Sequence, residues 1–322
     1  MFVISTLNIN GINNVNKQYQ LIDFMKNNYI DILLLQEHNI RVHDAINKEL
    51  DDFCHISINY AISSKGGTAI LINRKVPFTI IREEKSADSR IISMRLKIYD
   101  QIIHIINVYA HSGNEKNVDR ENLFQNELIY YLRNSLHNTF IGGDWNCVLS
   151  ERDTTSDNFV ISKALLNTVR NLNLRDAWHL KNRQVEYTYV RQNYGSRIDR
   201  VYVRDLANCI NNIKVIHVSF SDHSCVQTEL NLSEIPKKGR GYWKMNTSLL
   251  DNEEIKEKFK KEWVKMTSVK NRYNNLNEWW ELYVKKEIKK FFIREGRREM
   301  AKKYGLIEYL EFCSIGLYNE VN

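Results

Sequence analysis

The chain has 322 residues, of which 43% are hydrophobic and only two are proline. This length and composition predict a globular protein with a sizeable core and exclude an intrinsically disordered chain. Five cysteines without a CxxC pair argue against a zinc site and favour a reducing compartment. The first ten residues do not resemble a signal peptide, and no apolar stretch has the length of a membrane span. We therefore expect a soluble, intracellular protein without a membrane partner.

The formal net charge of +7 is distributed unevenly along the chain. Residues 1–232 contain 26 Lys and Arg against 25 Asp and Glu, whereas residues 233–322 contain 20 against 14. A near-neutral first part and a basic second part suggest two regions with different roles, and a basic excess suits nucleic acid.

In chain order, short apolar runs alternate with amphipathic stretches. Residues with helical spacing occupy 18–27, 117–136 and 162–172. Runs rich in Ile, Val, Leu and Tyr predict strands at 2–9, 31–35, 67–72, 78–82, 91–98, 102–109, 139–142, 198–203, 214–218 and 224–230. Many short strands with few helices between them predict two packed sheets covered by helices, an α/β sandwich.

A boundary is predicted near Pro236, Gly239 and Gly241, followed by helices at 253–269 and 277–303. We expect a first domain at residues 1–232 and a basic helical extension at residues 233–322.

Polar residues stand where the apolar runs end or begin. Asn8 and Tyr109 lie near or at the ends of predicted strands, and Glu37, Asp144 and Asn146 follow strands. At the starts of later strands stand Asp199 and the pair Asp222 and His223. If the later strands run antiparallel to the earlier ones, all of these residues fall on one rim of the sandwich. Taken singly, each is better explained as a turn residue, a surface charge or a structural histidine. Their ordered co-occurrence favours a catalytic site.

The ordered set resembles the endonuclease, exonuclease and phosphatase superfamily, which contains DNase I, the apurinic endonucleases, inositol-polyphosphate phosphatases and LINE endonucleases. The motifs are Asn8, Gln36-Glu37, Gly143-Asp144-Trp145-Asn146, Arg197-Ile198-Asp199 and Ser221-Asp222-His223, and the resemblance covers residues 1–232. It implies a four-layered, DNase I-like α/β sandwich of two mixed sheets flanked by helices. It also implies hydrolysis of phosphate esters with Mg²⁺, for which Mn²⁺ is a substitute.

By motif position, the resemblance assigns a role to each residue. Glu37 is the principal Mg²⁺ ligand, assisted by Asn8 and Asp222, since Mg²⁺ prefers oxygen ligands. Asp144 activates or aligns the attacking water and Asn146 orients it. His223 contacts the scissile phosphate with its ring held by Asp199, and Tyr109 donates a hydrogen bond to the phosphoryl oxygens.

Three departures from the family pattern bear on the substrate. Ser112 replaces the usual Asn of a Pro-Asn pair, and Asn10 stands where abasic-site nucleases usually carry an acid. Ser196 replaces a tryptophan, which suggests an incomplete apolar wall and argues against abasic-site repair. LINE endonucleases select DNA through the loop that is here residues 191–196. The expected DNA contacts are Tyr194 and Ser196 of this loop, Arg197 next to it, and Ser112. No base preference is legible from this loop.

The segment at 239–250, the Glu278-Trp279-Trp280 stretch and the basic run at 285–303 resemble the linker ahead of reverse transcriptase in LINE polyproteins. A solvated helical hairpin explains the basic run equally well. No reverse-transcriptase core follows before Asn322, which leaves open a fragment, a truncated copy or a deliberately cut piece.

Three functions remain. The first is a nuclear endonuclease that nicks duplex DNA to expose a 3′ hydroxyl for target-primed reverse transcription, with element RNA as a further partner of the tail. The others are a cellular abasic-site nuclease or phosphatase, and a catalytically silent nucleic-acid-binding remnant.

Overall fold

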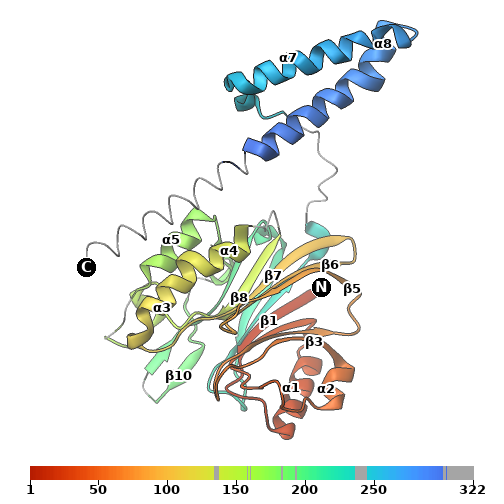
Figure 1. Ribbon diagram of the computed structural model, residues 1–322. Coiled ribbons are helices and arrows are strands. Elements are labelled where there is room, and N and C mark those ends of the chain that lie inside the picture. The colour runs from red at the N-terminus through yellow and green to blue at the C-terminus, as the bar shows by residue number, and fades with distance from the viewer. Residues whose placement is uncertain are drawn as a thin grey trace. The chain divides into compact units, whose positions relative to one another are not determined.

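The computed structural model describes residues 1–133, 138–157, 159, 161–182, 184–192, 194–235, 245–299 and 302. The chain divides into two compact units, Met1–Lys237 and Lys238–Asn322 (Figure 1). Each unit has its own hydrophobic core.

One six-stranded sheet of the first unit has the order β13-β14-β1-β2-β4-β3. Its central strands β1 and β2 are parallel, and the remaining neighbours are antiparallel. The strand bounds are β1 Phe2–Asn8, β2 Ile32–Gln36, β3 Cys54–Asn59, β4 Thr68–Asn73, β13 Ile210–Ile216 and β14 Cys225–Leu230.

The other six-stranded sheet has the order β5-β6-β7-β8-β12-β9, with β7 and β8 parallel. Its strands are β5 Phe78–Lys85, β6 Ile91–Ile98, β7 Gln101–Tyr109, β8 Thr139–Asp144, β9 Arg175–Asp176 and β12 Asp199–Arg204. A separate two-stranded ribbon pairs β10 (Tyr189–Arg191) with β11 (Tyr194–Ser196). In both large sheets the later strand, β14 or β12, is antiparallel to the strand that precedes the site, β1 or β8.

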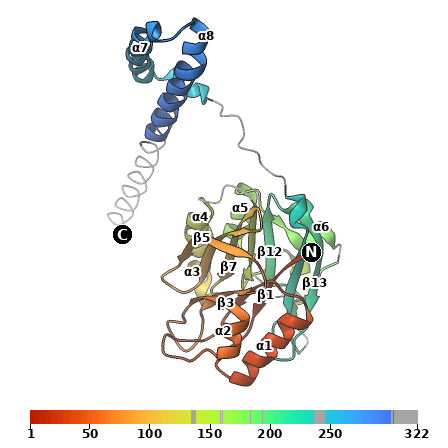
Figure 2. The same ribbon diagram turned by 90° about the vertical axis from the view of Figure 1, so that its right-hand side faces the viewer.

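The two sheets face each other across one apolar core, and helices cover their outer faces (Figure 2). Residues such as Ile4, Leu34, Met94, Ile105 and Phe140 interlock in this core, and burial of such side chains is the main stabilising contribution to folding. On the outer face of the first sheet lie α1 (Val15–Asn27) and α2 (Lys48–Phe53). On that of the second lie α3 (Asn117–Asn122), η2 (Leu123–Glu127), α4 (Leu128–Arg133) and α5 (Lys163–Asn171). The expected four-layered sandwich is confirmed.

The remaining helical pieces of this unit are short. They are η1 Asn114–Lys116, η3 Glu151–Asp153, α6 Ala177–Lys181, η4 Ala207–Cys209 and η5 Leu232–Glu234. Ile235, which follows η5, is buried in the core between the sheets. The first unit therefore continues past Leu232, where the sequence placed its end.

The second unit is a helical hairpin with an aromatic core. It comprises η6 (Thr247–Asp251), α7 (Glu253–Ser268), η7 (Lys270–Arg272), α8 (Leu276–Trp279), η8 (Trp280–Val284) and a helical continuation at 285–299. Phe259 of α7 packs on Phe291 and Phe292, with ring centroids 5.3 and 5.2 Å away. No described helix is long and apolar enough to cross a membrane.

Some expectations lie outside the described residues. These are the boundary at Pro236, Gly239 and Gly241, the first half of the segment at 239–250, and the ends of the helices expected at 117–136 and 277–303. The strand β3 and the helices α2 and α6 were not predicted. The β3 sequence, Cys-His-Ile-Ser-Ile-Asn, alternates apolar and polar residues, but its half-buried face carries too little hydrophobicity to stand out.

Candidate active site

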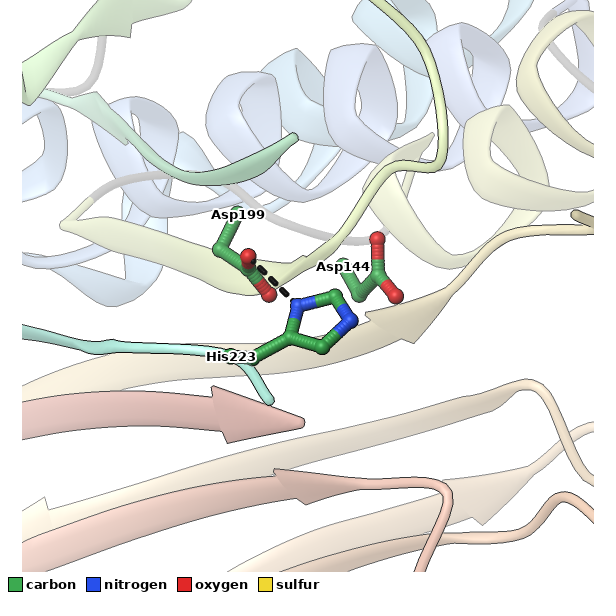
Figure 3. Close-up of side chains that lie close together, drawn as sticks. All are labelled: Asp144, Asp199 and His223. Atoms are coloured by element: carbon green, nitrogen blue, oxygen red, sulfur yellow. Dashed lines mark hydrogen bonds and ion pairs between the residues drawn. The ribbon is translucent and has the colours of Figure 1, made fainter. Parts of the chain in front are cut away.

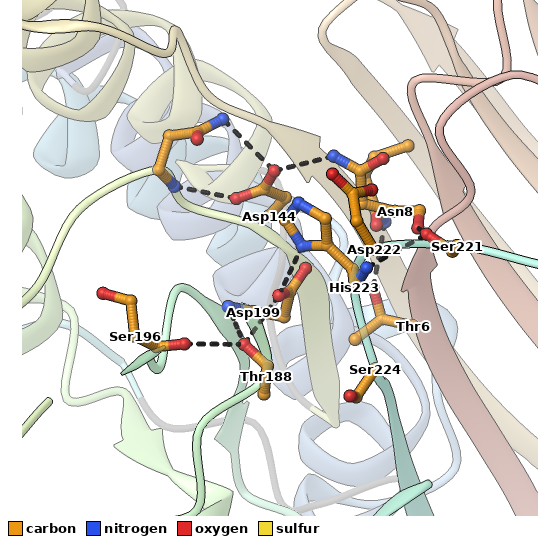
Figure 4. Close-up of polar contacts among 12 residues, drawn as sticks. Thr6, Asn8, Asp144, Thr188, Ser196, Asp199, Ser221, Asp222, His223 and Ser224 are labelled. Atoms are coloured by element: carbon orange, nitrogen blue, oxygen red, sulfur yellow. Dashed lines mark hydrogen bonds and ion pairs between the residues drawn. The ribbon is translucent and has the colours of Figure 1, made fainter. Parts of the chain in front are cut away.

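The polar residues at the strand ends converge on one rim of the sandwich (Figure 4). Tyr109 and Asp199 both pair in register with Asp144, the last residue of β8. Asn8 ends β1 beside Gln36 of β2, and Glu37 comes next along the chain. Ser221 ties the loop before β14 to this rim, because its hydroxyl donates to the Asn8 carbonyl at 2.6 Å.

His223 and Asp199 form a buried ion pair. The Nδ1 atom of His223 lies 2.8 Å from Oδ2 of Asp199 (Figure 3). The same oxygen accepts a 2.6 Å hydrogen bond from Thr188. Burial opposes the charged imidazole, but Asp199, and then Asp144 and Asp222, raise the pKa of His223 to about 10. The imidazole is therefore a cation at neutral pH, and its ring orientation is fixed.

Asp144 is the buried carboxylate at the centre of the site. Its Oδ2 accepts hydrogen bonds from Asn8 at 2.9 Å and from the Asn146 side chain at 3.2 Å. Its Oδ1 accepts from the Asn146 backbone at 2.9 Å. A Cβ at Gly143 would lie 1.9 Å from the Val108 carbonyl, so only glycine lets β8 run this close to β7 just before Asp144.

Burial, and then the charge of Asp199, raise the pKa of Asp144 to about 7, although the charge of His223 acts in the opposite direction. A raised pKa makes a carboxylate a stronger base towards a nearby water molecule. Asp144 is thus suited to act as a general base.

Glu37 lies between the two sheets at the mouth of the site. Its Oε2 accepts hydrogen bonds from the Tyr109 hydroxyl at 2.9 Å and from Asn8 at 3.4 Å. Burial and the adjacent Glu37 raise the pKa of Tyr109, which stays protonated and a donor. The backbone of Glu37 is left-handed, with φ of 52°, as is that of Asn146, with φ of 46°. Such conformations are uncommon for residues other than glycine and cluster at functional sites.

Asp222 is exposed beside the same pocket. Its Oδ1 accepts a 3.0 Å hydrogen bond from the Asn10 side chain. The ammonium of Lys17 donates to the carbonyls of Ile9 and Asn10 at 2.6 and 3.1 Å. These contacts fix the turn after β1, which carries Asn8 and Asn10.

The donors around Glu37 fit a hard divalent cation. Within the described part of the chain, Oε1 of Glu37 accepts no hydrogen bond, so it is available to a metal ion. Asp222 supplies a second, exposed carboxylate and Asn8 an amide, and oxygen ligands of this kind are those that Mg²⁺ binds.

Asp144, Asp199 and His223 also place ligand-type atoms within 4.8 Å of one another. This trio is less suited to a cation, because the charged imidazole already provides the positive charge and a protonated ring nitrogen cannot coordinate. The neighbouring Glu37 group is the better metal site.

A buried polar bridge joins the two sheets directly beneath the site. The Gln36 amide donates to Asn107 at 2.6 Å and to Thr6 at 2.9 Å. The Asn107 amide donates across the core to the carbonyls of Leu35 and Ala69, both at 2.8 Å. Gln36 precedes Glu37, and Asn107 lies two residues before Tyr109. The bridge therefore fixes the two strands that carry this hydrogen-bonded pair.

An open pocket exposes these groups to solvent, and two of the expected DNA contacts line it, Ser112 and Tyr194. The pocket is lined by Asn8, Asn10, Glu37, Ser63, Lys65, Gly66, Arg90, Tyr109, Ser112, Gly113, Asp144, Asn146, Tyr189, Tyr194, Ile198, Asp222 and His223. All eight residues predicted to be catalytic are brought to the rim, and Asp199 sits behind His223 rather than at the pocket surface.

The other two expected DNA contacts are turned inward. The Ser196 side chain is completely buried. Arg197 is 3% exposed and forms ion pairs with Asp153 at 2.9 Å and with Asp176 at 2.8 Å. Direct contact with DNA would require both residues to rearrange, so neither belongs to the pocket surface that meets a substrate.

The expectation of an incomplete apolar wall at Ser196 also has to be revised, because Ser196 is buried and other side chains form the wall. Tyr189 lies on the His223 ring at 4.9 Å between centroids, and its ring meets that of Tyr194 at 6.3 Å. Two tyrosines of the β10–β11 ribbon therefore provide an aromatic wall. The sequence missed Tyr189 because three-residue strands have too little periodicity to predict which side chains face a site.

Sequence reasoning also missed Arg90 and Thr188. The Arg90 guanidinium lies 4.9 Å from the centre of the Tyr109 ring and donates to the carbonyls of Tyr109 and Ala110. Both residues contact side chains that were predicted to be catalytic: Arg90 lies over the Tyr109 ring, and Thr188 donates a hydrogen bond to Asp199. An Arg or Thr in a loop carries no local signal for such a role.

A buried carboxylate with a raised pKa, an oriented imidazolium and an open group of oxygen atoms thus lie together at one rim of the sandwich. The chain belongs to the Endonuclease/Exonuclease/phosphatase family, whose pattern matches residues 5–223. It is accordingly an enzyme of the nuclease and phosphodiesterase type.

Solved structures share the fold. A 3′ phosphatase from Neisseria bound to a product DNA hairpin superposes with a TM-score of 0.60 at 20% identity, covering 72% of this chain and 100% of the other. An AP endonuclease from Archaeoglobus fulgidus gives 0.61 at 18% identity, with 72% and 100% covered. The endonuclease domain of TRAS1, a telomere-specific non-LTR retrotransposon, gives 0.54 at 14% identity, with 72% and 99% covered.

The match to one sequence relative covers more of this chain than the matches to these solved structures do. A transposon TX1 149 kDa protein of Xenopus laevis is 26% identical over 289 residues, which is 87% of this chain. The chain spans only 22% of the length of that relative.

Proposed function

We propose that this chain is a Mg²⁺-dependent DNA endonuclease, active also with Mn²⁺, that nicks one strand of duplex DNA. The nick leaves a 3′ hydroxyl that primes reverse transcription of a LINE-type retrotransposon, so the protein acts in the nucleus. The observation that carries the proposal is the placement of Asp144 between Asn8 and the His223–Asp199 pair in an open pocket.

Each side chain has a role in hydrolysis of the phosphodiester. Asp144 takes a proton from the attacking water, which Asn146 orients. His223 donates a hydrogen bond from its charged ring to a phosphate oxygen, and Asp199 keeps that ring oriented. Tyr109 donates its hydroxyl hydrogen to Glu37 and so keeps that carboxylate in place beside the reacting phosphate. When bound by Glu37, Asn8 and Asp222, Mg²⁺ supplies charge stabilisation for the phosphate and the leaving oxygen.

The second unit supports the retrotransposon assignment over a cellular role. The first unit ends at residue 237 of 322, so a match to 87% of the chain must extend into the second unit. We therefore propose that the domain at residues 1–232, completed by the core contact of Ile235, is catalytic. The basic extension that follows contacts nucleic acid, with element RNA as a partner.

An abasic-site nuclease or a 3′ phosphatase is the second candidate, because solved proteins with those activities share the fold. The aromatic wall of Tyr189 and Tyr194 leaves this candidate stronger than the serine at position 196 suggested. A silent nucleic-acid-binding remnant is the third, and the intact set of catalytic side chains argues against it.

The test compares matched duplexes with and without one abasic site, and then offers the nicked product to a DNA polymerase. We expect comparable nicking of the two duplexes and full extension of the ends. A strong preference for the abasic duplex would assign the enzyme to repair, and ends that a polymerase cannot extend would refute the priming role.

A further inference from the structure

The long helix that ends the described part of the second unit has an unusual surface. Between residues 285 and 299, every exposed side chain is basic: Lys285, Lys286, Lys289, Lys290, Arg294, Arg297 and Arg298. We name these seven residues the basic face. The apolar side of the same helix, which carries Phe291 and Phe292, packs on Phe259 of α7.

Glutamates neutralise the basic face only in part, because four of its seven residues form ion pairs. Glu295 is buried, and its single carboxylate is shared by Arg294 and Arg298, both at 3.0 Å, and by Lys258 at 3.8 Å. Lys285 and Lys290 each pair with a glutamate near the edge of the face. Within the described residues, Lys286, Lys289 and Arg297 form no ion pair.

Helix α7, in the same unit, provides the contrast. Its exposed charges are mixed, with Glu253, Glu254 and Glu257 against Lys260, Lys261 and Lys265. Lys260 pairs with Glu257 at 2.6 Å and Lys265 with Glu262 at 3.1 Å. An ordinary solvated helix surface has this mixture, whereas one of a single sign repels itself unless an anion binds to it.

We propose that the basic face binds the phosphate backbone of a nucleic acid, separately from the catalytic pocket. The inference rests on the proposed function and deepens it by naming the residues and the chemistry of the second contact. Rows of Lys and Arg along a helix neutralise successive phosphates without reading the bases. A membrane surface suits this helix less well, because a helix on a membrane inserts its apolar side, and here that side is buried against α7.

The test uses the full chain and two variants that remove the same charge. One carries Lys286→Gln, Lys289→Gln and Arg297→Gln, and the matched control carries Lys260→Gln, Lys261→Gln and Lys265→Gln. Fluorescence anisotropy in EDTA measures the binding of a single-stranded RNA and of a DNA duplex across a salt series. Because EDTA stops hydrolysis, the result does not depend on the nuclease activity.

Each phosphate contact contributes about 0.7 to 0.9 to the slope of log affinity against log salt. We expect the basic-face variant to lose about two in slope on RNA, DNA or both, and the control to match the parent. The arm with the larger loss identifies the nucleic acid. Equal losses in both variants would show that the effect depends on net charge alone. Unchanged binding by the basic-face variant would show that the basic face does not bind nucleic acid. Each of these two results overturns the proposal.

Plasmid nicking by the parent chain and the control variant, measured with Mg²⁺, separates this inference from the proposed function. We expect both to nick. A parent chain that binds nucleic acid through the basic face but does not nick plasmid would contradict the proposed function and still support this inference.

Discussion

At the scale of single residues, the site depends on groups whose neighbours alter their chemistry. Asp144 is raised towards neutrality by burial and by Asp199, while His223 is held in its charged form by the same Asp199. One buried carboxylate thus raises the pKa of both its neighbours, adding to the larger effect of burial at Asp144 and opposing burial at His223. The sequence could identify these residue types at strand ends, but it could not show that they share one cluster, because 55 residues separate Asp144 from Asp199 and a further 24 separate Asp199 from His223.

Replacement of Asp199 by Asn should shift the pH dependence of nicking. His223 has its folded pKa raised above the usual value, so its charged form persists until the pH approaches about 10. Without the carboxylate that raises this pKa, the alkaline limb of the rate profile should move to lower pH. We also expect the rate at neutral pH to fall about a hundredfold. A profile with an unmoved alkaline limb would show that His223 does not need to be charged.

Replacement of Glu37 by Gln should weaken metal binding without disturbing the fold. The change keeps the shape of the side chain and removes one charge from the proposed ligand group. We expect nicking to be lost at moderate Mg²⁺ and Mn²⁺ binding, measured by electron paramagnetic resonance, to weaken. Glu49→Gln, an exposed change on α2, is the control for loss of a carboxylate. Undiminished Mn²⁺ binding by Glu37→Gln would place the metal elsewhere.

At the scale of elements, the site forms because of the directions in which the strands run, and locating the strands along the sequence is not enough to predict it. Most strands were predictable from apolar runs, and β6 was predicted with the bounds that the structure shows. The antiparallel return of β12 and β14 could be stated only as a condition, since it depends on sheet pairings between distant segments. The three-residue strands β10 and β11 were beyond prediction, and so was the wall that they form.

The bridge between β2 and β7 gives a test at this scale. Asn107→Leu removes two hydrogen bonds across the core and leaves the Gln36 amide with one partner fewer. We expect a loss of about 1–3 kcal/mol in the free energy of unfolding, because the remaining buried polar groups are unsatisfied. Urea denaturation measures it, with Asn212→Leu on the exposed face of β13 as the matched control. Equal stability of the two variants would mean that the bridge contributes nothing.

At the scale of the whole molecule, the chain has two compact units with separate cores. The uneven charge along the sequence suggests two regions with different roles, and we propose hydrolysis for the first and nucleic-acid binding for the second. Residues without strong periodicity join the units, and only packing reveals that Ile235 belongs to the first core. The basic face likewise emerges only when the buried side of its helix is known, because the sequence alone shows Lys, Arg and Glu interspersed with Ile and Phe and does not say which of them are exposed.

A chain of residues 1–237 should therefore fold and nick plasmid, whereas removal of Ile235 should destabilise it. Ile235→Ala empties a buried site in the core between the sheets, which costs about 2–5 kcal/mol. Thermal unfolding of the shortened chain, with and without this change, measures the effect. An unfolded chain of residues 1–237 would contradict the division into independent units.

The claim that this chain is a metal-dependent nuclease is tested most directly by relaxation of supercoiled plasmid. The parent chain, incubated with Mg²⁺, should convert supercoiled plasmid to the open circle, and EDTA should prevent the conversion. Asp144→Ala and His223→Ala should each retain the parent's circular dichroism and lose about a hundredfold or more in rate. Relaxation that persists in EDTA, or at the parent's rate in both variants, would contradict the account.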